Sequence, residues 1–153
     1  MAISRGAGTE IIRTIHFDYD AANTSDQQLI IGEQHHIYTV LNITCFANYA
    51  TSSQNDGLLV KLQAFDCSDG SANQVIKIFS LGITYGQQTF VWNDKFSFNG
   101  YDATGFNGGI STTAEQNALA DQGGSNAQEL RMNKLHSNDK WHVTCTYIDQ
   151  NNA

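Results

Sequence analysis

The chain has 153 residues, a formal net charge of −7 and no proline. A chain of this length fits one domain that can bury a core without disulfides or metals. The acidic balance argues against nucleic acid or an anionic membrane as the main partner, because both are negatively charged. No apolar run is long enough for a membrane-spanning helix, and residues 1–8 lack the apolar core of a secretory signal, so we expect neither.

The first half of the chain predicts an arm followed by strands. Residues 1–9 are small and contain glycine, which indicates a flexible N-terminal arm. Residues 10–18 alternate with period two and are rich in β-branched side chains, which is typical of a strand. Residues 29–32 form a second, short strand candidate, and residues 35–48 form the longest one. Simple alternation places five residues of the longest candidate on one face: Ile37, Thr39, Leu41, Ile43 and Cys45.

Strand patterns continue through the second half at 58–66, 74–81, 87–98 and 140–149. Residues 99–110 hold four glycines and are interpreted as an ordered loop with a possible role in function. Residues 128–136 fit neither the helical nor the strand period cleanly.

One short helix is predicted near 113–122. Thr113 is a candidate N-cap with Gln116 at the third helical position, and the pair Gly123–Gly124 would end the helix.

These patterns predict an all-β fold: a single-domain β-sandwich or jelly-roll-like barrel over residues 10–149, with the one helix and a polar tail at 150–153. Strands do not alternate with helices, which disfavours a doubly wound fold.

The three cysteines cannot all pair within one chain. Cys45 and Cys145 lie on the apolar face of alternating runs, so we expect buried free thiols that pack as small apolar groups. Cys67 follows a strand end. No CxxC pair is present, and the set suits folding in a reducing cytoplasm.

No pattern for catalysis or for a cofactor emerges. The adjacent pair His35–His36 would point to opposite faces of a strand, and His16, His136 and His142 lack the spacing of metal ligands along the chain. The Asp66–Asp69 loop could hold calcium, but Asp69–Gly70 is more typical of a turn. No nucleophile motif, carboxylate pair or phosphate-binding loop is found, so we predict no enzyme and assign no catalytic, cofactor or metal residue.

An aromatic segment stands out at residues 90–100, directly before Tyr101. If alternation continues through Asn93–Asp94, one face carries four aromatic residues: Phe90, Trp92, Phe96 and Phe98. Three interpretations remain open, namely core packing, a subunit interface anchored by tryptophan, or sugar stacking on Trp92 or Tyr101.

Three stretches resemble small structural proteins of tailed bacteriophages, particularly marine ones. They are residues 5–13 (RGAGTEIIR), 32–40 (GEQHHIYTV) and 91–98 (VWNDKFSF). The resemblance implies a virion component assembled in the host cytoplasm. Capsid decoration (cement) proteins of this size are often β-rich and trimeric, and they bind the head lattice.

The hypothesis from the sequence is a non-enzymatic capsid decoration protein that stabilises the head lattice by burying subunit interfaces. Its partners would be further copies of itself, in a trimer, and the major capsid protein or other virion proteins. The alternative is a glycan- or receptor-binding β-domain of a tail, neck or fibre. The candidate interface residues are Ile3, Arg5, Trp92, Phe98, Tyr101 and Phe106.

Overall fold

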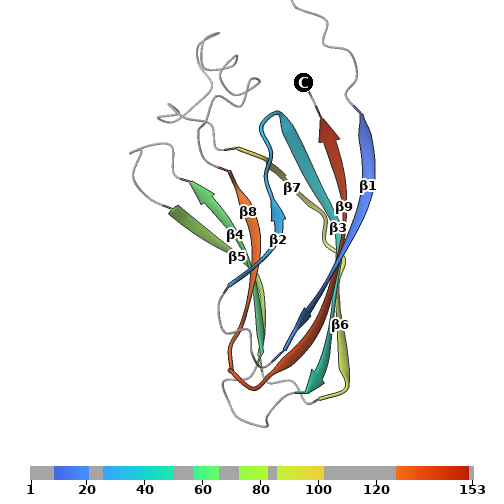
Figure 1. Cartoon of the computed structure of the whole chain (residues 1–153), viewed down its shortest axis with the longest axis vertical. Helices are drawn as coiled ribbons and strands as arrows, with labels where there is room; N and C mark the ends of the chain where they lie inside the picture. The colour runs from blue at the N-terminus through green and yellow to red at the C-terminus, as the bar shows by residue number, and fades with distance from the viewer. Residues whose placement is uncertain are drawn as a thin grey trace, which may run out of the picture.

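The structure of the chain is a computed structural model that describes residues 9–20, 26–49, 57–65, 73–82, 86–101 and 127–151. This part forms two antiparallel sheets that face each other (Figure 1). The first sheet has the order β1-β9-β3-β6, and β7 also pairs with β3. Its strands are β1 Glu10–Tyr19, β3 His36–Tyr49, β6 Gln88–Trp92, β7 Phe96–Asn99 and β9 Lys140–Asn151.

The second sheet has the order β2-β8-β4-β5. Its strands are β2 Gln27–Ile31, β4 Leu58–Phe65, β5 Asn73–Leu81 and β8 Glu129–Lys134. The predicted all-β sandwich is therefore confirmed. The described ranges contain no helix and therefore no membrane-spanning helix. Residues 1–8 of the expected arm at 1–9, the helix near 113–122 and the part of the 99–110 loop beyond Tyr101 lie outside them.

The core fills the space between the two sheets. Its largest fully buried side chains come from both sheets and include Trp141, Tyr19, Ile43, Leu58 and Leu130. Each large apolar side chain that leaves water contributes about 1.5–3 kcal/mol. Alternation explains the pattern from Trp141 to Cys145, where the inward residues of β9 are apolar and the outward ones are polar.

A β-bulge at Leu41 shifts the inward face of β3. Val40 pairs with Tyr147 and Asn42 pairs with Thr146 on β9, so Leu41 is one extra residue. Even-numbered residues such as Val40 face the core before the bulge, and odd-numbered residues such as Ile43 face it afterwards. The predicted single face was therefore wrong for Ile37, Thr39 and Leu41 and right for Ile43 and Cys45.

Residues 129–134, whose pattern was ambiguous, form β8 with inward-facing Leu130, Met132 and Lys134. Lys134 obscures the period-two alternation of apolar residues, because it is a charged residue at an inward position where only 5% of it is exposed. Its Nζ donates to the Asp20 and Ser137 carbonyl oxygens and lies 5.1 Å from the centre of the Tyr19 ring. Burial lowers the pKa of Lys134.

A tight backbone junction joins the two sheets near the start of β3. The Gly32 amide donates to the Gln128 carbonyl at 2.9 Å, the Gln128 amide to the Gly100 carbonyl at 2.7 Å, and the Gly100 amide to the His36 carbonyl at 2.8 Å. A Cβ on Gly100 would lie 1.9 Å from the Glu33 carbonyl oxygen. Only glycine fits there, and this junction positions Glu33 and His36.

Candidate functional site

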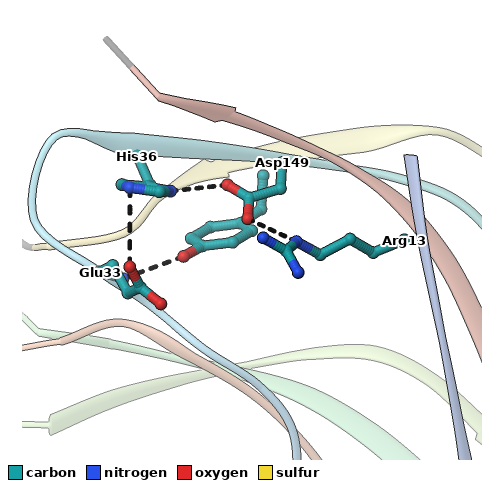
Figure 2. Close-up of polar contacts among 5 residues, drawn as sticks. Arg13, Glu33, His36 and Asp149 are labelled. Atoms are coloured by element: carbon teal, nitrogen blue, oxygen red, sulfur yellow. Dashed lines mark hydrogen bonds and ion pairs between the residues drawn. The ribbon is translucent and has the colours of Figure 1, made fainter. Parts of the chain in front are cut away.

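A network of charged side chains lies beside this junction, on the core-facing side of the first sheet (Figure 2). Asp149 on β9 accepts hydrogen bonds from Arg13 Nε on β1 at 2.8 Å and from His36 Nδ1 on β3 at 2.6 Å. Glu33 Oε2 lies 3.6 Å from His36 Nε2, and the Glu33 amide donates to the Tyr38 hydroxyl at 3.1 Å. The network therefore ties three strands to the β2–β3 connection.

The network is graded from buried to exposed. The side chains of Asp149 and His36 are 8% and 15% exposed, whereas those of Arg13 and Glu33 are 50% and 72% exposed. Burial raises the pKa of Tyr38 to about 12, so its hydroxyl keeps its proton at neutral pH. Tyr38 therefore serves as a hydrogen-bonding group and not as an acid or base.

A cavity of about 300 Å³ opens next to this network. Arg13 and Ile15 line it from β1, Leu29 and Ile30 from β2, and Tyr38 and Asp149 from β3 and β9. It lies between β1, an edge strand of the first sheet, and β2, an edge strand of the second sheet. Its volume is at the lower end of the range for small-molecule sites. A small polar molecule could reach the Arg13 guanidinium there, although Asp149 already neutralises that charge.

The described cysteines do not supply a nucleophile. Cys45 and Cys145 are fully buried free thiols, as predicted. Burial raises the pKa of each thiol to about 12, so neither forms a thiolate at neutral pH. Cys67 and the Asp66–Asp69 loop lie outside the described ranges.

A second polar cluster lies on the outer face of the first sheet. Asp18 on β1 is directly opposite His142 on β9, and His16 lies two residues before Asp18 on the same face. One oxygen of Asp18 contacts both imidazoles, at 2.8 Å from His16 Nε2 and in a short contact with His142 Nδ1. Sequence reasoning missed this grouping because strand pairing, and not chain spacing, brings His142 to the others.

The outer strands carry most of the exposed apolar side chains. β1, β2, β5 and β6 end the two strand orders, so each has one long side without a strand partner among the described residues. Of the eight large apolar residues that are exposed in the described ranges, six lie on these strands: Ile11, Ile12, Ile31, Val75, Ile76 and Val91. Ile12 has the highest exposure, at 70%.

The structure places three of the six predicted interface residues. Trp92 stacks on Phe79 with ring centres 5.0 Å apart, and its Nε1 donates to the Asp94 carbonyl at 2.9 Å. Phe98 is 6% exposed and stacks on Tyr38, so it belongs to the chain's own core. Tyr101 forms an isolated bridge with Ala127. Ile3, Arg5 and Phe106 lie outside the described ranges.

The four aromatic residues of the segment do share the inward face. Phe90 and Trp92 pair with Cys45 and Ile43, while Phe96 and Phe98 pair with Val40 and Tyr38. All four pack against the core, which confirms the core-packing interpretation. An interface role for Trp92 or Tyr101 remains a prediction.

No protein-family model and no curated protein matches the chain. Among solved structures, the chain is similar to a protein described under "Bacillus endospore appendages form a novel family of disulfide-linked pili", at 8% identity and a TM-score of 0.47. That match covers 100% of this chain and 97% of the other. It is also similar to a chain from infectious bursal disease virus, Gx strain, at 12% identity and a TM-score of 0.38. The second match covers 95% of this chain but 33% of the viral one.

Proposed function

We propose that this chain is a non-enzymatic structural protein that assembles with copies of itself through the edge strands of its sandwich. The observation that supports this most is that six of the eight large apolar residues exposed in the described part of the chain lie on edge strands. An exposed strand edge offers unpaired backbone groups to another strand, and apolar side chains beside it add buried area on pairing.

Lysine and proline, two residues that commonly protect such edges, are scarce on these strands. Native edge strands are commonly blunted by lysine or proline. This chain has no proline, and the outer strands β1, β2, β5 and β6 contain one lysine, Lys77 on β5. A second copy of the chain is the favoured partner, because every copy carries the same edge strands and can offer them to another copy. Most soluble oligomers are symmetric assemblies of one chain.

In its finer form, the proposal is a capsid decoration protein, trimeric on a head lattice of the host-assembled virion, as the resemblance to tailed-bacteriophage proteins implies. The arm at 2–9 and the loop at 99–110 would then contact the lattice. Deleting residues 2–9 should weaken binding to major capsid subunits and leave the melting temperature nearly unchanged. Unaltered binding would remove the arm from the account.

Edge substitutions test the assembly itself by sedimentation velocity. Ile12→Lys on β1 and Ile76→Lys on β5 place a charge on exposed edge positions, with exposures of 70% and 54%, where folding tolerates it. Gln63→Lys on the inner strand β4 is the matched control. We expect at least one edge variant to dissociate while the control does not. Equal sedimentation of all three variants and the wild type would contradict the proposal.

A second candidate function rests on the cavity beside Arg13. Its volume of about 300 Å³ and its mixed lining of Arg13, Tyr38 and Asp149 suit a small polar ligand such as a sugar. This supports the alternative of a glycan- or receptor-binding β-domain of a tail, neck or fibre. Binding on a glycan array that Arg13→Gln abolishes would favour it, and an array without binding would count against it.

A further inference from the structure

We propose that His16, Asp18 and His142 form a binding site for a divalent transition-metal ion of the zinc class on the outer face of the first sheet. The proposal is independent of self-assembly, because it concerns side chains within one copy. It rests on how the paired strands β1 and β9 bring the three groups together.

The potential ligand atoms converge on one point. One nitrogen from each histidine and one oxygen from Asp18 all lie within 4.8 Å of one another. Ligands of tetrahedral zinc sit about 2.0–2.2 Å from the ion, so neighbouring ligand atoms are roughly 3.4 Å apart. Asp18 Oδ1 now bridges the two imidazoles, at 2.8 Å from His16 Nε2. Small side-chain rotations would therefore make room for a metal ion that all three side chains bind in place of this bridge.

The neighbours of the cluster hold the two rings in place. The remaining nitrogen of His16, Nδ1, lies 3.1 Å from Thr144 Oγ1, which orients the ring with Nε2 towards Asp18. The His142 ring stacks on Phe46 with centres 5.9 Å apart and an angle of 20° between the planes. Because all of these residues stand on paired strands, the donor atoms are set by the sheet and not by a loop.

The donor set selects the class of ion. Two imidazole nitrogens and one carboxylate oxygen suit zinc, copper or nickel, whereas calcium and magnesium prefer oxygen ligands. Three protein ligands leave a position for water. The ligand side chains are 55%, 63% and 39% exposed for His16, Asp18 and His142, so an ion can enter directly from solvent.

Calorimetric titration of the full, untagged chain with zinc chloride near neutral pH tests the site. The wild type should bind one zinc ion per chain in a saturable manner. His16→Gln and His142→Gln should each weaken binding at least about tenfold, since even the loss of a supporting outer-shell group commonly costs 10–100-fold. His136→Gln is the matched control, because His136 lies after β8, outside the cluster. It should bind zinc like the wild type.

Circular dichroism would verify that each variant is folded before titration. A second readout is the melting temperature, which zinc should raise in the wild type and not in His142→Gln, because a ligand that binds only the folded state stabilises it. Absence of saturable binding up to about 1 mM zinc would overturn the proposal. Equal affinity of the wild type and both ligand variants would also overturn it, because the zinc would then be bound elsewhere.

Discussion

Arg13 on β1 and Asp149 on β9 form an ion pair on the core-facing side of the first sheet, with 2.8 Å between Arg13 Nε and Asp149 Oδ2. They are 136 positions apart in the chain. The other carboxylate oxygen accepts from His36, so both oxygens of a carboxylate that is only 8% exposed are used. Both residues of the pair line the cavity, and Asp149 links Arg13 to His36.

Asp149→Asn should therefore destabilise the chain. An amide has one acceptor oxygen, so either Arg13 or His36 would face an NH₂ group. We expect the free energy of unfolding to fall by about 1.5–3 kcal/mol in urea denaturation. Glu33→Gln is the control, because the Glu33 side chain is 72% exposed and should cost about 1 kcal/mol or less. Equal losses would mean that Asp149 has no special role.

Gly100→Ala should disrupt the junction that positions Glu33. The new Cβ would lie 1.9 Å from the Glu33 carbonyl oxygen, so the backbone must move. We expect a loss of about 1–3 kcal/mol by thermal or urea unfolding. Gly82→Ala is the matched control, since a Cβ there meets nothing within 4 Å and should shift stability by about 0.5 kcal/mol at most. A neutral Gly100→Ala would show that the junction is looser than described.

Deleting Leu41 should preserve the fold. Without this extra residue, Val40 would be followed by Asn42, and the pairing of both with β9 would run on regularly. Val40, Ile43 and Cys45 would still face the core. Deleting Thr44 should instead prevent folding, because a one-residue slip turns every following side chain to the other face. Circular dichroism and urea unfolding distinguish the two, and a folded Thr44 deletion would contradict this account of the bulge.

Glu129 should make stability depend on acid. Burial acts to raise its pKa, but hydrogen bonds from Arg131 at 2.6 Å and Gln28 at 2.9 Å outweigh burial and hold the pKa below the usual 4.5. The folded state thus releases this proton more readily than the unfolded state. The resulting stabilisation is complete above pH 4.5 and disappears as the pH falls through the lowered pKa.

Glu129→Gln should accordingly lower the free energy of unfolding by about 1 kcal/mol at neutral pH and have little effect in strong acid. Urea unfolding of the variant and the wild type at a series of pH values measures the difference. Arg131→Gln should shrink the same pH dependence. A deficit of Glu129→Gln that persists unchanged into strong acid would show that the charge is not responsible.

The sequence predicted the parts of the fold that depend on local alternation. β9 was recognised from Trp141, Val143 and Cys145 and runs two residues beyond the predicted end, to Asn151. β8 was not recognised, because Lys134 takes an inward position and offsets its charge with backbone carbonyls. The predicted inward face of β3 was right only after Leu41, because nothing in the residue types around Leu41 marks a bulge.

The polar clusters could not be predicted from spacing along the chain. Asp149 meets Arg13 and His36, and Asp18 meets His142, only because β9 lies between β1 and β3. A sequence that predicts the strands without their order leaves these partners unknown. The exposed apolar residues of the edge strands also depend on the strand order, because the exposure of Ile12 is informative only once β1 is known to be an outer strand.

Native mass spectrometry of the unmodified chain over a concentration series tests the central claim of self-assembly most directly. We predict a defined oligomer at a whole multiple of the 16.8 kDa chain mass, with a trimer expected for a decoration protein. The oligomer should gain population as the concentration rises. A monomer of 16.8 kDa throughout the range from about 1 µM to about 1 mM would contradict assembly through the strand edges.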